Sequence, residues 1–441
     1  MLKRSTESTP AHLRRPDRRA WLVTAMIVMF MVINFADKAV LGLAAHPIME
    51  ELDISKSTYG AISSSFYVLF SLSGLVVGFF STRISSHVLL CVMTALWAVV
   101  QLPVLVVAAV PTLIAGRVLL GAAEGPAASM SMHALYKWFP AERRAFPSAL
   151  QISGAALGTL ISAPLLTWVI TAHGWRAAFA SLAVVSAGWS LVWFLMGQDG
   201  PYGEEHPARH GTGPADRPGV TATTPVPYRR LLLNGTVIGS IASAFGASWA
   251  LSLSSAWLPV YLSSQLDMTP ARAATTISII SGLSLVLLLA VSPVVDALKS
   301  RGVSSRWSSG ALQGGAVVVA GCAMASFPLV DATGPRLILI AVAFGGHAIA
   351  IPLHYVTTAE VVPTGRRGAV FGIVAATGTL PGLVAPFLSG RVIDGAASEQ
   401  AGYATVFLIA AAVMVVSGAA AMSAIHPERD APRIRAAGKH P

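Results

Sequence analysis

Four charged side chains stand inside otherwise apolar stretches of this sequence. Asp37 and Lys38 lie together in the first long apolar stretch, and Arg117 and Glu124 lie in a later one. An ionisable group at bilayer depth costs about 2.5–3.5 kcal/mol even on the mildest scale, so such groups persist where they are paired or face water. Carboxylates and cations in that setting can exchange protons and hold an anion, which makes these four residues the first candidates for function.

The spacing of these residues limits the pairs that they can form. Arg117 and Glu124 are seven residues apart, which separates them by about 10 Å along one face of a single helix. We therefore expect Arg117 to reach a carboxylate on a neighbouring helix, namely that of Asp37. Asp37 and Lys38 are adjacent and diverge by about 100° around a helix. One of them can then face the Arg117 helix while the other faces a central cavity.

The same residues suggest a switch between an anion and a proton. A buried carboxyl group favours its protonated form, whereas a nearby cation favours the ionised form. Occupation of the cation by an anionic ligand can therefore change the protonation of the carboxylate. Asp37 and Glu124 are thus candidates for proton coupling, and Lys38 is a candidate anchor for an anion. The alternative is a purely structural ion pair within the bundle, which would explain Arg117 equally well.

The composition is that of a membrane protein. Of the 441 residues, 54% are hydrophobic and 11% are charged, with a mean hydropathy of +0.67, whereas soluble domains carry about 25% charged residues. These figures exclude a soluble enzyme. The net charge of +10 does not indicate nucleic-acid binding, because the Lys and Arg residues cluster in alternate loops, as a polytopic membrane protein requires. The expected fold class is an all-α membrane protein.

Apolar runs about 20 residues long are typical of membrane-spanning helices, and this sequence predicts twelve of them in two six-helix halves. The predicted spans are 20–45, 57–80, 86–109, 111–137, 144–172, 175–197, 231–264, 271–297, 305–329, 334–360, 366–394 and 400–425. The Pro-, Gly- and Thr-rich stretch between the halves is typical of a flexible linker. The predicted division is a tail at 1–19, a half at 20–197, the linker at 198–230, a half at 231–425 and a tail at 426–441.

The distribution of positive charge predicts an orientation. Most of the 30 Lys and Arg residues lie in one alternate set of connections, which includes both tails and the 198–230 linker. Lys- and Arg-rich loops remain on the cytoplasmic side of a membrane. We therefore expect a multi-pass protein of the plasma (inner) membrane with both termini and the linker in the cytoplasm.

An internal repeat relates the two predicted halves. The motif P-x-x-R-R occurs at 140–144 and at 363–367, a separation of 223 residues. A G-x3-G pair at 154–158 is echoed at 378–382, within one residue of the same offset. Parallel repeats of helices are one of the plans on which secondary transporters are built.

Five short motifs then occur in order along the predicted spans and loops. They are N-F-A-D-K at 34–38, R-x3-G-x2-E-G-P at 117–126, K-W-F-P-x-E-R at 137–143, G-W-R-x2-F at 174–179 and W-L-P-x-Y-L at 257–262. In this order they resemble the major facilitator superfamily, and within it the anion:cation symporter group. That group includes bacterial sugar-acid/H⁺ symporters and vesicular glutamate and sialic acid transporters. The resemblance runs nearly end to end.

The resemblance implies an organic-anion transporter in which the positions of Asp37 and Glu124 carry protons. It also implies a substrate contact at Gln151, and Thr379 stands where the group often has Asn. Arg117 remains a candidate for substrate binding. A monomer is expected from the group, with an organic anion, H⁺ and the lipid bilayer as partners.

Some positions depart from the group's pattern. Lys38 replaces an arginine, Phe35 and Phe70 replace tyrosines, and the loop after the second span reads G-x3-T-R at 78–83, without its carboxylate. A lysine is a point charge without the bidentate fork of arginine. The loss of polar groups favours a smaller or more apolar carboxylate over a hydroxyl-rich sugar acid, with Phe35 and Phe70 as candidate substrate contacts.

The repeat offset extends the site into the second half. It maps Glu124 onto His347 and Lys38 onto Tyr261. We therefore expect an apolar and aromatic wall there, with His347 and Tyr261 as candidate substrate contacts. A membrane histidine that only makes a packing hydrogen bond is the alternative for His347.

The sequence contains no Walker-type phosphate loop and no Cys/His cluster with metal-ligand spacing. We expect neither a cofactor nor an enzyme, and transport driven by a gradient. The favoured function is H⁺-coupled uptake of an organic carboxylate by rocking of two halves around a midplane site. A drug or metabolite/H⁺ antiporter is the alternative, although Thr159 stands where its G-x3-G-P-x2-G-G motif needs proline. A membrane sensor is a third, less favoured class, because the tails and linker are short.

Overall fold

The computed structural model describes residues 18–80, 84–140, 143–202 and 226–437, and every regular element in these ranges is helical. The elements are α1 (Arg18–Leu43), α2 (Ala45–Glu51), α3 (Lys56–Ser65), α4 (Tyr67–Phe80), α5 (Ser86–Val106), α6 (Val110–Glu124), α7 (Ala127–Tyr136), α8 (Ala145–His173), α9 (Trp175–Met196), α10 (Tyr228–Leu232), α11 (Gly235–Ala256), α12 (Leu258–Ser264), α13 (Pro270–Ser300), η3 (Arg306–Ala311), α14 (Leu312–Ser326), η4 (Phe327–Leu329), α15 (Thr333–Gly345), η5 (Gly346–Ile349), α16 (Ala350–Val361), α17 (Thr364–Gly378), α18 (Leu380–Asp394), α19 (Glu399–Ala424) and α20 (Pro427–Ala437).

Ten helical segments in the described ranges are long and apolar enough to cross a membrane. The two predicted spans that are not among these ten are each divided by a turn: 57–80 forms α3 and α4 with a turn at Phe66, and 111–137 forms α6 and α7 with a turn at 125–126. Pro126 stands at the second turn, and a proline lacks the N–H that would continue a helix. The predicted all-α membrane fold with two related halves is therefore confirmed.

Parts of several predictions fall outside the described ranges. These parts are Thr82 and Arg83 of the loop motif, Glu142 of the K-W-F-P-x-E-R motif, residues 1–17 and 438–441 of the tails, and residues 203–225 of the linker. Within the described ranges, the segment predicted as the C-terminal tail contains the helix α20, and the predicted span 231–264 begins later, at Gly235, because Asn234 caps α11 there.

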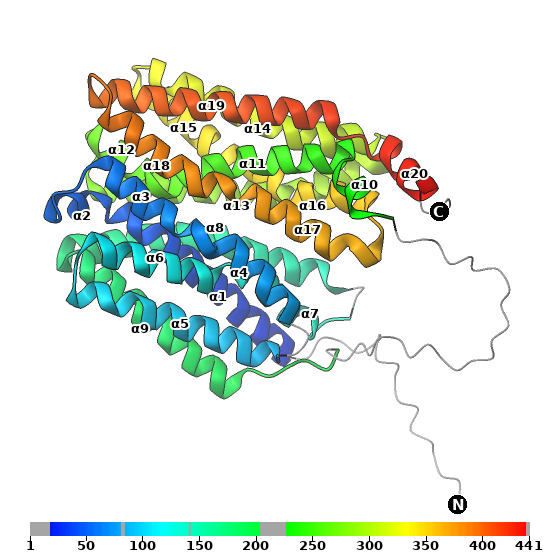
Figure 1. Cartoon of the computed structure of the whole chain (residues 1–441), viewed down its shortest axis with the longest axis horizontal. Coiled ribbons are helices and arrows are strands. Elements are labelled where there is room, and N and C mark those ends of the chain that lie inside the picture. Colours follow the sequence, from blue (N-terminus) through cyan, green and yellow to red (C-terminus); the bar gives the residue numbers. More distant parts are fainter. Residues whose placement is uncertain (1–17, 81–83, 141–142, 203–225, 438–441) are drawn as a thin grey trace, which may run out of the picture.

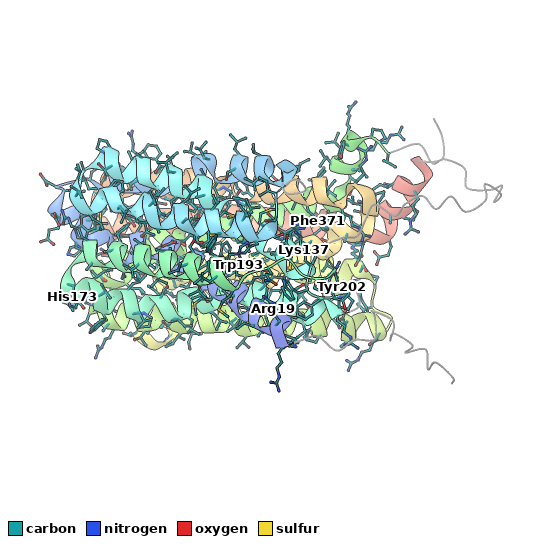
Figure 2. All side chains as sticks on the ribbon, turned by 90° about the horizontal axis from the view of Figure 1, so that it is seen from below. Arg19, Lys137, His173, Trp193, Tyr202 and Phe371 are labelled. Atoms are coloured by element: carbon teal, nitrogen blue, oxygen red, sulfur yellow. The ribbon has the colours of Figure 1, made fainter. Side chains whose placement is uncertain are left out.

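The helices run nearly parallel between two ends of the bundle. Figure 1 shows α2 and α12 at one end, here called the α2 end, and α10 and α20 at the other, here called the α20 end. Figure 2 places His173 at the α2 end, with Lys137 and Tyr202 toward the α20 end. The helices α1–α9 form the first half and α10–α20 the second.

The predicted repeat is visible in the hydrogen bonds of its two arginines. Arg144 donates from Nε to the carbonyl oxygen five residues earlier (3.0 Å) and from Nη2 to the carbonyl oxygen eight residues earlier (3.1 Å). Arg367 makes the same two bonds, at 3.1 and 2.8 Å. Each arginine thus satisfies carbonyl groups at the end of the preceding helix, which those groups need because they have no intrahelical partner.

The helix α20 is fastened to the second half by two carboxylates. Asp430 accepts hydrogen bonds from the Thr236 backbone N–H (2.9 Å) and hydroxyl (2.8 Å) at the start of α11. Burial raises the pKa of Asp430, but hydrogen bonds from Arg429 and Thr236 outweigh it and hold the pKa below its usual value. Glu428 accepts from the backbone N–H groups of Ser305 and Arg306. Each carboxylate also meets the positive end of a helix dipole.

In the first half, the G-W-R motif fastens α2 to the start of α9. The Glu51 carboxylate accepts from Arg176 through two bonds of 2.6 and 2.8 Å and from the Trp175 ring N–H at 2.7 Å. The hydrogen bonds from Arg176 and then Trp175 lower the pKa of Glu51 from 4.5 to about 2. The motif therefore has a structural role at the α2 end.

Polar contacts between the halves gather from the α2 end to the middle of the bundle. Asp394, the last residue of α18, accepts from the Ser57 N–H (2.7 Å), the Ser57 hydroxyl and the Lys56 N–H (3.3 Å), and thus caps α3 of the opposite half. Further contacts are Lys56–Glu399, Tyr59–Ala256, Ser64–Phe387, Leu160–Ser278 and Ser71–Thr379. The structure is therefore a state in which the halves are joined at the α2 end.

Glycines allow the backbones of the two halves to touch at this end. A Cβ on Gly42, Gly60 or Gly390 would lie 1.9, 2.4 or 2.2 Å from a backbone oxygen of the opposite half. Contacts this short exclude every larger residue unless the halves separate. Closure thus depends on bare backbone, with Asp394 adding charge-assisted hydrogen bonds.

The Asp394 contact can be tested by substitution. Asp394→Ala should favour opening of the α2 end, because loss of a helix cap costs about 1 kcal/mol, or about fivefold in an equilibrium. The readout is the rate at which an impermeant maleimide labels a cysteine introduced at Ser63, with Cys91 and Cys322 replaced by Ala.

Asp331→Ala is the matched control, since Asp331 is exposed and its ion pair, with Arg336, lies within its own half. Equal labelling of the Asp394 variant and the parent would show that Asp394 does not hold the halves together.

Candidate functional site

The four charged residues lie on two helices of the first half, α1 and α6, and α6 ends at the turn that interrupts the predicted span. Asp37 and Lys38 lie on α1, Arg117 lies on α6, and Glu124 is the last residue of α6 before the turn at Gly125. Lys38 Nζ lies 3.1 Å from Glu124 Oε2 and also donates to the side-chain oxygen of Asn34, one turn earlier on α1. The Glu124 side chain is fully buried, and that of Lys38 is 16% exposed.

Asp37 is bound differently from the sequence prediction. Its carboxylate accepts a 3.0 Å hydrogen bond from Gln101 Nε2 on α5, and its side chain is fully buried. Arg117 Nη1 donates to the backbone carbonyl oxygen of Asp37 at 3.2 Å, and not to its carboxylate. The predicted Arg117–Asp37 carboxylate pair is therefore wrong. The cation beside a carboxylate is Lys38, which faces α6, because the 100° between neighbours on α1 turns Asp37 toward α5.

Aromatic rings surround the Lys38 ammonium. Its Nζ lies 4.5 Å from the ring centre of Phe35, 5.4 Å from that of Phe70 and 5.8 Å from that of Phe66. The Arg117 guanidinium lies 4.8 Å from the Phe66 ring, so this ring contacts both cations. A cation over an aromatic face is stabilised by the ring quadrupole, more strongly when it is desolvated. We call Phe35, Phe66 and Phe70 the phenylalanine cage.

Several buried polar atoms of this cluster have no hydrogen-bond partner in the described part of the chain. They are Asp37 Oδ2, Glu124 Oε1, Arg117 Nε, Asn34 Nδ2 and Gln101 Oε1, while Glu124 Oε2 has the ion-pair contact with Lys38 but no hydrogen bond. Buried polar atoms in native proteins are almost always paired, so such a group of exceptions points to water, a proton or a ligand. Both carboxyl groups therefore have an oxygen available to take a proton.

A small cavity adjoins the cluster at the seam between the halves. Its volume is about 20 Å³, and its lining includes Lys38, Arg117, Ser63, Tyr67 and Ser252. A cavity needs about 10–15 Å³ to hold one water molecule. This cavity can therefore hydrate the two cations, but it is too small for an organic acid.

The remaining predicted site residues are dispersed. Gln151 donates to the Ser131 hydroxyl (2.9 Å) and the Ala128 carbonyl (3.3 Å), which makes it a helix–helix bond. Thr379 bonds Ser71 of the opposite half at 2.6 Å, close to Phe70 in the sequence.

Tyr261 and His347 are not brought to the Lys38 cluster. Tyr261 packs in an aromatic group with Phe327, Tyr403 and Phe407, at ring distances of 5.6, 5.4 and 4.9 Å. His347 is 3% exposed, in the 3-10 turn η5, with no partner for Nδ1 in the described chain. The repeat offset therefore located the interruption η5, which corresponds to the one after Glu124, but not a continuation of the site.

Sequence reasoning missed Gln101, Asn34 and Phe66. Gln101 and Asn34 could have been found as uncharged polar residues inside apolar spans, and Asn34 lies one turn from Lys38. Phe66 gave no such signal, because a phenylalanine in an apolar span is ordinary.

Two glycines hold the cage against α6. A Cβ on Gly121 would lie 1.8 Å from the carbonyl oxygen of Phe66, and one on Gly125 would lie 2.0 Å from that of Phe70. The backbone of α3 and α4 therefore rests directly on α6. This close approach brings Phe66 and Phe70 to Lys38.

Comparisons with known proteins agree with this architecture. Residues 26–386 match the family profile described as "Major Facilitator Superfamily". The hexuronate transporter of Bacillus subtilis is 24% identical over 91% of this chain and 94% of that protein. The D-galactonate transporter of Escherichia coli O6:H1 is 26% identical (88% and 92%), and the probable sulfoacetate transporter of Cupriavidus necator is 26% identical (94% and 95%).

Solved structures share the fold. A bacterial homologue of the human lysosomal transporter Spinster, in an inward-facing and occupied conformation, has a TM-score of 0.76 at 13% identity, with 96% of this chain and 99% of that chain covered. The D-xylose–proton symporter has a TM-score of 0.69 at 16% identity, with 89% and 97% covered.

The close packing of the phenylalanine cage against α6 predicts that alanine substitutions at two glycines of α6 differ in their effect on stability. Gly121→Ala should reduce the stability of the purified protein by about 1–3 kcal/mol, because the added methyl group overpacks the backbone at Phe66. Gly116→Ala, on the same helix, should be neutral, since its Cβ would meet only one atom, at an ordinary 3.6 Å. Thermal unfolding in detergent measures both variants. Equal melting temperatures for the two variants would contradict this packing.

Proposed function

The chain belongs to the Major Facilitator Superfamily, and on that premise we propose that it imports an organic carboxylate together with H⁺. Membership makes the protein a multi-pass membrane transporter and not an enzyme. The observation that carries the proposal is the Lys38–Glu124 ion pair, with the second buried carboxylate of Asp37 next to it in the chain. This pair combines an anion anchor with a proton acceptor in one site.

Lys38 is the anchor because a substrate carboxylate can replace Glu124 as the partner of its ammonium group. A substrate carboxylate that approaches the ammonium competes directly with Glu124, which is held at 3.1 Å. Arg117 is less suited, since it is 6% exposed and already bonded to the Asp37 carbonyl oxygen. Hexuronate, galactonate and sulfoacetate in the names of the relatives support an organic anion as the substrate.

Displacement of the Glu124 carboxylate from Lys38 is the reason that a proton binds together with the substrate. Once the substrate occupies Lys38, Glu124 is a buried charge without its cation, and burying an unpaired charge is so costly that the group neutralises by taking a proton. Asp37 receives only the Gln101 hydrogen bond on its carboxylate and is a second proton site. Anion and proton therefore bind together, which is the thermodynamic basis of symport.

Alternating access completes the proposal. The halves are joined at the α2 end, and opening that end requires Asp394 and the glycine contacts to separate. We infer from the distribution of Lys and Arg that the α20 end and both termini face the cytoplasm of a cell with the protein in its inner membrane. The working unit is taken as the monomer, as the resemblance to the anion:cation symporter group implies.

The antiporter alternative fits the site less well. An organic cation would enter beside Lys38 and Arg117, both already held by the phenylalanine cage. Like charges in a desolvated site repel strongly. A cationic drug is therefore a poor match for this site.

The experiment uses purified protein in liposomes that contain a pH-sensitive dye. Carboxylates from lactate-sized acids through aromatic acids to hexonates are added outside, and internal pH is recorded. Acidification with one class of acid, but not with its amide, is expected. Proton movement only with cationic or neutral drugs would replace the proposal with antiport.

The roles of Asp37 and Lys38 make separable predictions. Asp37→Asn should abolish accumulation driven by a pH gradient while substrate binding persists within about threefold, because the amide preserves shape and neutrality. Lys38→Ala should lose binding by at least about tenfold, since the charge-assisted contact is gone. Accumulation assays and calorimetric binding measure the two effects.

Two controls guard against general disruption. Lys38→Ala strands Glu124 without a cation, so the double variant Lys38→Ala/Glu124→Gln tests whether folding is restored while binding stays lost. Lys299→Ala removes a lysine from a different ion pair, with Glu360 near the α20 end, and should transport normally. Normal accumulation by both Asp37→Asn and Lys38→Ala would overturn the mechanism.

A further inference from the structure

We infer that the site selects monocarboxylates with a flat apolar or aromatic body over polyhydroxylated and dicarboxylic acids. This inference rests on the proposed function, because it assumes that a substrate carboxylate binds Lys38. It adds the chemical class of the rest of the substrate, and it assigns the selection to the phenylalanine cage.

The cage determines what surrounds the anchored carboxylate. With Lys38 Nζ at 4.5 Å from the Phe35 ring centre and 5.4 Å from that of Phe70, the body of a bound acid must pass beside these rings. Aromatic rings pair favourably at centre distances of about 4.5–7 Å, offset or edge to face. Phe66 and Phe70 already form such a pair at 5.3 Å. A substrate ring that is admitted when the halves separate can stack against this pair.

Asn34 Nδ2 and the Ser63 hydroxyl have no partner in the described chain and can pair with a substrate hydroxyl, but other neutral polar groups are already bonded. The Asn34 side-chain oxygen is taken by Lys38, Ser71 and Thr379 bond one another at 2.6 Å, and Gln151 bonds Ser131 at 2.9 Å. A substrate hydroxyl beyond the reach of Asn34 Nδ2 and the Ser63 hydroxyl must therefore break an internal bond or lie unpaired against a phenyl ring. Leaving a polar group unpaired in an apolar site is penalised. Each added hydroxyl should thus weaken binding.

A second acid group lacks a cation to receive it. The described helices α11, α14 and α18 carry no Lys or Arg except Arg391, in the last turn of α18 at the α2 end. Arg117 is buried beneath Phe66 and already donates to the Asp37 carbonyl oxygen, so it receives a second carboxylate only by losing that contact. A dicarboxylate would bring an unpaired charge into the site. One carboxylate on Lys38 is the arrangement that the charges match.

The test compares three acids of one size class on the purified protein in liposomes. Benzoate, gluconate and glutarate are assayed by equilibrium binding and by dye-reported proton uptake. Benzoate is expected to bind at least about tenfold more tightly than gluconate or glutarate. A tenfold ratio of dissociation constants corresponds to a difference in binding free energy of about 1.4 kcal/mol. In Phe35→Tyr/Phe70→Tyr, the added hydroxyls should reduce the benzoate-to-gluconate ratio at least about fivefold.

Phe194→Tyr is the matched control, because Phe194 is 63% exposed on the outer face of α9 and should leave the ratio unchanged. If gluconate or glutarate binds as tightly as benzoate and all binding is lost in Lys38→Ala, the selectivity inference is overturned and the proposed function stands. If carboxylate binding is unaffected by Lys38→Ala, the proposed function itself is overturned. If Phe35→Tyr/Phe70→Tyr has a normal melting temperature and an unchanged benzoate-to-gluconate ratio, the phenylalanine cage does not determine specificity.

Discussion

The ion pair between Lys38 and Glu124 is the interaction around which the first half is arranged. A lysine and a glutamate at bilayer depth are each unfavourable alone, and together they persist only while they touch. Their 3.1 Å contact fixes the rotation of α1 against α6. With Lys38 turned toward α6, its neighbour Asp37 must face α5, where Gln101 meets it. One pairing thus sets the surroundings of every other charged group in the bundle centre.

That pairing requires backbones that approach closely, which larger residues would prevent. Gly121 and Gly125 let α3 and α4 rest on α6, and this contact brings Phe66 and Phe70 to the ammonium. The same device recurs between the halves at Gly42, Gly60 and Gly390. Small residues at helix contacts are common in membranes, where packing replaces the hydrophobic driving force. In this protein, glycines allow the halves to touch at the α2 end and also bring the phenylalanine cage to Lys38.

The sequence predicted the helical fold, the repeat and the membrane-embedded charges, because apolar length and the cost of buried charge act locally along the chain. It did not predict partners. Spacing on α1 shows that Asp37 and Lys38 diverge, but only the packing of α5 and α6 decides which one meets which helix. Arg117 was assigned to the wrong group of Asp37 for this reason. Tyr261 occupies the position that the repeat offset assigns to Lys38, but its ring packs against Tyr403 and Phe407 and not in the site.

The two halves have kept the same arginine bonds, Arg144 in one and Arg367 in the other, at carbonyls five and eight residues earlier. The two halves therefore share a scaffold, whereas Asp37, Lys38, Arg117 and Glu124 all lie in the first half. Substitutions in the second half can reshape the space around a ligand while these four charges of the first half stay in place, so the shape of that space can change separately from its charge.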